Sequence, residues 1–205
     1  MGKHAKKEQA KKKQRTGIAI AIIITFIMLS STLAYVLMDT TDTSIRYKSI
    51  KFSQDSQGFY SAKIYGKQRT FYTSPGEFSS FNISDAAIER IISAGGVYLV
   101  FDPNIDASFL SAIDQISAEM FSELSPYSIF VQRGITNESS VYSLPIIDCR
   151  NATEAAPILV FELSNETMLS ENGSCMTAKI QSGRDLIAAR DSLEFSILYN
   201  LANKK

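Results

Sequence analysis

The longest uncharged run of the chain lies near its N-terminus, at residues 17–38, where twenty-two consecutive positions carry no charged side chain. A helix rises about 1.5 Å per residue, so a helix of this length measures about 33 Å and crosses a hydrocarbon core of about 30 Å. The pattern therefore predicts a single transmembrane helix and makes the lipid bilayer a partner of this protein.

Beyond the uncharged run, residues 45–72 alternate apolar and polar positions over short stretches rich in aromatic and β-branched side chains. Turn-forming residues separate these stretches at 55–58 and again at 65–68. Such a pattern is typical of a β-hairpin or meander. Ser74, Pro75 and Gly76 then end this segment.

The remainder of the chain alternates helical and strand patterns. Ser84 is placed to cap a helix that ends at Gly95 and Gly96, and a buried strand is expected at 97–101. Asp106 is placed to cap a longer helix, whose expected core stripe is Phe109, Leu110, Ile113, Ile116, Met120, Phe121 and Leu124.

Three more strands and a final helix complete the pattern. The strands are expected at 128–132, 157–163 and 174–180, the last as the return of a hairpin around Asn172 and Gly173. The helix is expected at 183–202, with a core face of Leu186, Ile187, Leu193, Ile197, Leu198 and Leu201. Strands interleaved with amphipathic helices predict an α/β fold with an antiparallel element at each end of the chain.

Charge is distributed unevenly around the uncharged run. Residues 1–16 contain seven Lys and Arg residues and one Glu, a net charge of +6. The chain after residue 38 contains 14 Lys and Arg residues and 20 Asp and Glu residues, a net charge of −6. The positive-inside rule predicts a basic cytoplasmic tail at 1–16, a linker at 39–44 and an extracytoplasmic domain at 45–205. An acidic domain is not expected to bind nucleic acid.

Other interpretations of the N-terminal region stay open. The run from Ile18 to Leu29 also fits the core of a cleaved signal peptide, with Thr32-Leu33-Ala34 as the cleavage site. A pilin-like leader cut after Gly17 is a further alternative, although the run lacks the glutamate that pilins carry there. The lysine-rich tail is interpreted as a topology signal that attracts anionic headgroups, with RNA contact as the alternative.

Glycosylation sequons are unusually dense. Five of the eight asparagines lie in Asn-x-Ser/Thr triplets, where about one or two such triplets are expected by chance. The predicted acceptors are Asn82, Asn137, Asn151, Asn165 and Asn172.

The chain holds two cysteines, Cys149 and Cys175. An even pair in an exported domain predicts a disulfide, and free buried thiols are the alternative. A disulfide that closes the loop between Cys149 and Cys175 would stabilise the fold by about 3 to 4 kcal/mol in the chain-entropy model.

Candidates for catalysis are few. The only histidine is His4, in the predicted cytoplasmic tail, so the domain beyond the membrane has no imidazole for acid–base, triad or zinc chemistry. Asp102 and Asp106 follow the carboxyl end of a predicted strand, where α/β proteins place their sites. A turn at Asp102 and a helix N-cap at Asp106 explain both residues without a function. The remaining carboxylates that we weighed for glycoside cleavage or a hard cation are Asp148, Glu154, Asp185 and Asp191. We predict no catalytic, cofactor or metal site.

From Val97 to residue 202, the order strand, helix, strand, long loop, strand, strand, helix resembles the thioredoxin-like fold. Pro157 stands before an apolar strand, as the cis-proline of thioredoxins does. Where that family carries Cys-x-x-Cys, this chain has Asp102-Pro-Asn-Ile105, so the resemblance implies a domain without the redox site. The overall plan also resembles small single-pass membrane proteins of archaea, a resemblance that supplies no function.

The expected function is therefore that of a membrane-anchored glycoprotein, a non-catalytic accessory or scaffold subunit that binds another membrane or envelope protein. One alternative is an extracytoplasmic enzyme or chaperone that uses carboxylates or a degenerate thioredoxin-like groove. The other is a pilin-like surface-structure subunit.

Overall fold

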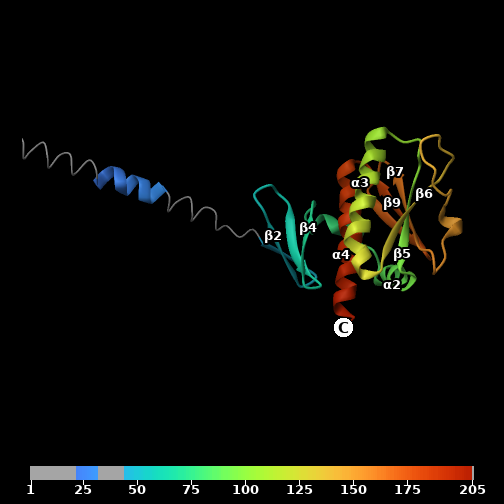
Figure 1. Ribbon diagram of the computed structural model, residues 1–205, viewed down its shortest axis with the longest axis horizontal. Helices are drawn as coiled ribbons and strands as arrows, with labels where there is room; N and C mark the ends of the chain where they lie inside the picture. Colours follow the sequence, from blue (N-terminus) through green and yellow to red (C-terminus); the bar gives the residue numbers. More distant parts are fainter. Residues whose placement is uncertain (1–21, 32–43, 205) are drawn as a thin grey trace, which may run out of the picture. The chain divides into compact units, whose positions relative to one another are not determined.

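The computed structural model describes residues 22–31 and 44–204 (Figure 1). Residues 22–31 are helical, and the rest of the predicted span 17–38 lies outside the described residues, as do the tail 1–16 and nearly all of the linker 39–44. No helix among the described residues is both long and apolar enough to cross a membrane. The chain forms two compact units, Met1–Thr43 and Ser44–Lys205.

The second unit begins with an antiparallel meander, as the alternating pattern predicts. Its four strands pair in sequence order and are β1 (Ser44–Tyr47), β2 (Ile50–Gln54), β3 (Tyr60–Ile64) and β4 (Lys67–Phe71). The two predicted turns join β2 to β3 and β3 to β4. A third turn, at Lys48 and Ser49, joins β1 to β2. The sequence does not predict it, because both residues adopt positive φ, of 44° and 69°, which non-glycine residues seldom do.

A second sheet has the strand order β6-β5-β7-β9-β8. Strand β5 pairs in parallel with β6 and β7, β7 pairs in parallel with β9, and β8 pairs antiparallel with β9. The bounds are β5 (Gly96–Phe101), β6 (Phe130–Ile135), β7 (Ile158–Leu163), β8 (Met168–Asn172) and β9 (Cys175–Ile180). The prediction of an α/β fold with an antiparallel element at each end is confirmed.

Three helices accompany this sheet: α2 (Asp85–Ala94), α3 (Ala107–Leu124) and α4 (Gly183–Asn203). Ser84 caps α2 by accepting a hydrogen bond from the Ala87 N–H, and Asp106 caps α3 by accepting one from the Ser108 N–H, as predicted. Gly95 ends α2 in the left-handed conformation, at φ 70°.

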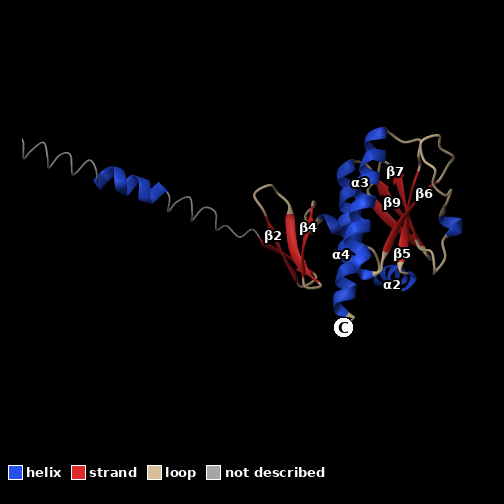
Figure 2. Ribbon diagram, in the orientation of Figure 1, coloured by secondary structure: helices blue, strands red, loops and turns tan. Residues whose placement is uncertain are grey.

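The helices α3 and α4 lie between the two sheets (Figure 1). Val97, Leu99 and Phe101 of β5 belong to the core that these helices share. The opposite face of the five-stranded sheet is covered by loop 136–157, drawn in tan apart from one short blue helix in Figure 2. There Ile147 packs over Val100 and lies so close to Gly134 that a Cβ at Gly134 would meet the Ile147 Cδ1 at 3.1 Å.

An aromatic cluster joins the meander to the rest of the unit. The rings of Phe52 and Phe71 on the meander, Phe78 of η1 (Glu77–Phe81) and Phe195 of α4 have centroid separations between 5.5 and 6.2 Å. All four side chains are at most 1% exposed. The two sheets therefore share one hydrophobic core through α4.

Two predictions need correction. The strand expected at 128–132 begins two residues later, because the turn η2 (Ser125–Tyr127) ends with Ser128 in the left-handed conformation, at φ 60°. Phe121, expected in the core stripe of α3, is 48% exposed. The thioredoxin-like resemblance stays a prediction from the order of elements.

Candidate functional site at the edge of strand β6

Strand β6 is an edge of the five-stranded sheet, and part of its backbone has no strand beside it. The Phe130 N–H donates to the Gly95 carbonyl, and the Thr136 N–H donates to the Phe101 carbonyl. Because backbone groups alternate in direction along a strand, the even-numbered residues of β6 direct their N–H and C=O groups towards β5. The odd-numbered residues face the other way. Among these, Ile135 pairs with the Pro145–Ile147 segment, whereas no strand of the described chain pairs with Val131 or Arg133 on that side.

One hollow lies on the helix side of this edge, with a volume of about 380 Å³. The side chains of Val131 and Arg133 lie on this face of the sheet, because the two residues are in parallel register with Val97 and Leu99, whose side chains belong to the core. The Arg133 guanidinium pairs with Asp114 of α3, which also accepts a hydrogen bond of 3.0 Å from the Tyr142 hydroxyl. The other residues that line the hollow are Ser117, Ala118, Phe121 and Leu144.

A second hollow, of about 250 Å³, lies at the same edge on the opposite face of the sheet. Phe130 and Gln132 of β6 line it, together with Tyr98 of β5 and the backbone around Gly95 and Gly96. Ala155 and Ala156 close it from loop 136–157. The open part of β6 therefore has one hollow on each face of the sheet.

Two phenylalanines stand exposed beside the open edge. Phe121 of α3 is 48% exposed and Phe130 of β6 is 47% exposed, and their ring centroids lie 6.4 Å apart. Exposed aromatic side chains of this kind are enriched at protein interfaces. We therefore treat the β6 edge, consisting of residues 130–134 with the two hollows, as the candidate binding surface.

The five predicted glycosylation acceptors, Asn82, Asn137, Asn151, Asn165 and Asn172, are all exposed. Two of them bracket β8, the other edge of the sheet: Asn165 precedes it and Asn172 is its last residue. Asn137 follows the end of β6 rather than its open part. No predicted acceptor lies within the open edge at residues 130–134.

The predicted disulfide between Cys149 and Cys175 is present, with 5.3 Å between the two Cα atoms. Cys149 begins η3 (Cys149–Asn151) in loop 136–157, and Cys175 begins β9. The bond therefore ties the covering loop to the sheet, beside the small core of Val100 and Ile158.

Four of the carboxylates that we weighed for catalysis serve local turns and caps instead. Asp102 accepts from the Asn104 N–H at 2.9 Å, and Asp106 caps α3. Asp148 caps η3 and pairs with Arg150, whereas the Asp185 carboxylate accepts from the N–H and the hydroxyl of Ser182, the N-cap of α4. The structure does not bring these four together, and no group of three or more potential metal ligands occurs among the described residues.

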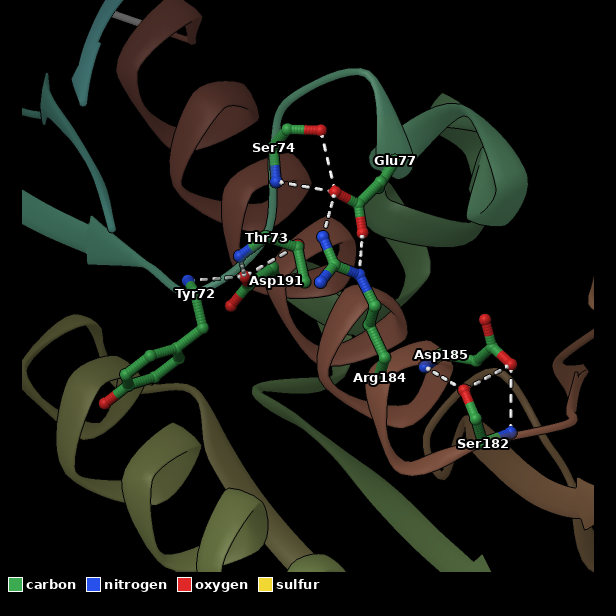
Figure 3. A network of polar contacts seen from close by, with 8 residues as sticks. All are labelled: Tyr72, Thr73, Ser74, Glu77, Ser182, Arg184, Asp185 and Asp191. Atoms are coloured by element: carbon green, nitrogen blue, oxygen red, sulfur yellow. Dashed lines mark hydrogen bonds and ion pairs between the residues drawn. The ribbon is translucent and has the colours of Figure 1, made fainter. Parts of the chain in front are cut away.

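Asp191 is different, because it is fully buried where β4 passes into η1 (Figure 3). Its Oδ2 accepts from the backbone N–H of Tyr72 at 2.8 Å and from the N–H and hydroxyl of Thr73 at 2.8 and 2.9 Å. Its Oδ1 accepts from Arg190 Nη1 at 2.7 Å. Burial raises the pKa of Asp191, and the hydrogen bonds from Arg190 and Thr73 act in the opposite direction.

A second clamp holds the same connection, as Figure 3 shows. The Glu77 carboxylate accepts two hydrogen bonds from Arg184, at 2.8 and 2.9 Å, and two from Ser74. The hydrogen bonds from Arg184 lower the pKa of Glu77. Together the Asp191 and Glu77 clamps fasten the end of the meander to α4.

Arg190 is also buried, and it pairs with Glu194 at 2.9 Å and with Glu119 of α3 at 3.6 Å. Desolvation raises the pKa of Glu194 to about 7, although the Arg190 charge opposes this. Glu194 Oε2 lies close enough to Arg190 for an ion pair but finds no hydrogen-bond partner among the described residues. The Tyr72 ring lies over the guanidinium, 5.4 Å from it. This cluster joins α3, α4 and the end of β4.

Neither the β6 edge nor this charged cluster is predicted from the sequence. The edge depends on strand order, which the sequence does not state. The cluster had one available signal: Arg190 and Glu194 have the i, i+4 spacing of a helical ion pair and lie between apolar residues of α4.

Comparisons with protein-family models, with curated proteins and with solved structures find no match for this chain. The interpretation of its function therefore depends on the geometry of the residues described above.

Proposed function

We propose that this protein is a membrane-anchored glycoprotein, a non-catalytic accessory or scaffold subunit that binds another membrane or envelope protein. The observation that carries the proposal is the pair of exposed rings, Phe121 and Phe130, beside an open stretch of edge strand. Exposed edges and apolar side chains are features that soluble domains ordinarily cover or interrupt. Their presence together favours a surface that a partner covers.

The anchor is supported by the sequence of the N-terminal region. Residues 17–38 carry no charge, residues 1–16 carry a balance of +6, and residues 22–31 are helical. In this arrangement the linker 39–44 would keep the α/β domain close to the membrane surface, where a partner in the same membrane is within reach.

Glycosylation supports the choice of surface. Glycans on Asn165 and Asn172 would flank β8 and shield that edge from other chains. Glycans on Asn82, Asn137 and Asn151 would lie outside the open part of β6. The β6 edge would then stay accessible on a protein that is otherwise covered with polar sugar.

The test is cross-linking in membranes of the native host, with a photoreactive amino acid at position 130 of the full chain. Position 170, in the middle of β8, is the matched control. We expect one recurrent membrane or envelope protein joined to position 130 and not to position 170. The proposal is wrong if neither position captures a recurrent partner and the purified protein instead reduces disulfides or cleaves a glycan at enzymatic rates.

A further inference from the structure

We propose that Asn165 is the sequon asparagine that accepts a glycan on the folded domain, and that the other four accept one only before the chain folds. This inference rests on the proposed function, which places the domain where sequons are used, and it sets the order of glycosylation and folding. It depends on how firmly the fold holds the two reacting side chains of each sequon.

Glycan transfer uses both of these side chains, the asparagine amide and the Ser or Thr hydroxyl two residues later. The amide Nδ2 forms a bond to the anomeric carbon of a sugar carried on a lipid phosphate. The bond from that carbon to the phosphate oxygen breaks, the lipid phosphate leaves with the electron pair, and an amide proton passes to a base of the transferase. A sequon therefore reacts only when both side chains are free to enter the transferase.

The hydroxyl of the Asn82 sequon belongs to a helix cap. Ser84 completes this sequon, and its Oγ accepts from the Ala87 N–H at the start of α2. The same hydroxyl donates to Glu171 Oε2 at 2.6 Å, and the Ser84 N–H donates to Glu171 Oε1 at 2.7 Å. Because its release would break both the cap and the contact with β8, the folded domain withholds this hydroxyl.

The hydroxyl of the Asn137 sequon holds a turn in loop 136–157. It belongs to Ser139, whose Oγ accepts from the N–H groups of Val141 and Tyr142, each at 3.1 Å. Tyr142 is fixed in turn, because its own hydroxyl donates to Asp114 of α3 at 3.0 Å. The sequon therefore stays closed while the loop is fastened to α3.

The Asn151 sequon lies beside the disulfide. Asn151 Oδ1 accepts from the Asp148 N–H at 2.9 Å, within the capping box of η3, and Cys149 of the same short helix is bonded to Cys175. Apart from one contact of Cys149, the hydrogen bonds of residues 148–156 to other described residues stay within that segment. The disulfide is therefore the main tie that holds this sequon against the sheet.

The Asn172 sequon is held because it forms a hairpin turn. Asn172 pairs with Cys175 at the end of the ladder between β8 and β9, and the two residues between them make the turn. The Gly173 carbonyl also accepts from Arg90 of α2 at 2.7 Å. Since Cys175 carries the disulfide, this triplet cannot lift from the surface unless the ladder opens.

The Asn165 sequon differs from the other four. It lies in the connection between β7 and β8, where Asn165 and Glu166 are exposed and Thr167 is half-buried. Neither the Asn165 amide nor the Thr167 hydroxyl forms a hydrogen bond with any described residue. The Asn165 carbonyl accepts from the side chain of Gln181, which is itself exposed. Both reacting side chains are therefore free in the folded domain.

The experiment uses the full-length chain in detergent micelles, produced without glycan and with its disulfide formed. A purified oligosaccharyltransferase and a lipid-linked sugar are added, and mass spectrometry follows the occupancy of each sequon with time. A synthetic peptide spanning each sequon gives its rate without the fold, and each rate on the folded chain is divided by that of its own peptide. We expect this ratio to be about tenfold or more higher at Asn165 than at the other four, because one or two hydrogen bonds must break there.

A double variant, Cys149→Ser with Cys175→Ser, tests the tie at Asn151. We expect the ratio at Asn151 to rise about tenfold or more, because segment 148–156 is released from the sheet. The ratios at Asn82 and Asn137 are the matched controls and should stay as in the parent, since their contacts do not involve the cysteines. Equal rises at all three would reject the disulfide as the tie of this one sequon.

Two outcomes on the parent chain would overturn the inference: equal ratios at all five sequons, including no transfer at any of them, or a higher ratio elsewhere than at Asn165. Preferred transfer at Asn165 on a chain that cross-links to no partner from position 130 would support this inference and count against the proposed function alone. A recurrent partner together with equal ratios would support the proposed function and reject only this order of glycosylation and folding.

Discussion

Oδ2 of Asp191 accepts both hydrogen bonds that Thr73 can donate, from its N–H at 2.8 Å and from its hydroxyl at 2.9 Å. The two residues are separated by 118 positions in the sequence. Their contact fixes the end of the meander against the middle of α4, inside the core rather than on its surface.

The first prediction concerns this contact. Asp191→Asn should lower the free energy of unfolding by about 3 to 5 kcal/mol, because it removes the buried charge that Arg190 pairs with. Thr73→Val should cost only about 1 kcal/mol, since two backbone N–H groups still reach the carboxylate, and Thr73→Ser is the conservative control. Urea denaturation of the full chain measures all three. An Asn variant as stable as the parent would contradict the assigned role.

The second prediction concerns pH. The pKa of Glu194 is raised to about 7 from 4.5, so the folded state holds its proton more tightly than the unfolded state. The resulting stability is fully present below about pH 4.5 and is lost as the pH rises through 7, by about 3 kcal/mol in total. Glu194→Gln should abolish this loss. Glu77, whose pKa is lowered, acts in the opposite sense at acid pH.

Denaturation midpoints at a series of pH values, for the parent and for Glu194→Gln, give the difference directly. Glu162→Gln, a change at an exposed position of β7, is the matched control and should follow the parent curve. Parallel curves for the parent and Glu194→Gln between pH 5 and 8 would show that Glu194 does not titrate in this range.

The third prediction concerns the bond between Cys149 and Cys175. Its reduction should lower stability by about 3 to 4 kcal/mol and speed hydrogen exchange in loop 136–157, because the bond ties that loop to β9. A double variant with serine at both positions should show the same loss and no response to reductant. Mass spectrometry of a non-reduced digest should show the two peptides joined, and complete alkylation without reductant would refute the bond.

The fourth prediction concerns two glycines. A Cβ at Gly96 would collide with the Phe130 carbonyl oxygen, so Gly96→Ala should destabilise the fold by about 1 to 3 kcal/mol and disturb the start of β6. Gly183, the first residue of α4, has open space around it, and Gly183→Ala should be neutral or stabilising by up to about 1 kcal/mol. Thermal denaturation distinguishes the two, and equal effects would contradict the packing described here.

The fifth prediction concerns topology and glycosylation in the native host. Protease added outside sealed cells should reach the α/β domain while a label on Met1 stays protected, because the positive-inside rule predicts that a basic tail stays in the cytoplasm. Glycan should be found on at least two of the five sequons. A mature chain beginning at Ile18 or Tyr35, or unmodified peptides at every sequon, would reject these expectations.

Local signals in the sequence predicted most of the secondary structure. Several features depend only on a few adjacent residues: the caps at Ser84 and Asp106, the end of α2 at Gly95 and the hairpin at Asn172. The conformational preferences of such residues act locally, whatever the tertiary fold. Errors arose where tertiary contacts override that local pattern. Phe121 matches the helical period of α3 and still lies outside the core, because β6 ends the sheet beside it.

The sequence by itself determined the α/β class, the meander, the caps of α2 and α3, and the two cysteines that form the bond, because hydrophobic period, turn chemistry and cysteine count are local or compositional properties. Only the tertiary structure decided which strands are edges, that α4 carries Arg190, Asp191 and Glu194 into the interior, and that hollows flank the open part of β6. These features arise from strand order and from contacts between residues far apart in the chain, and no local pattern records either one.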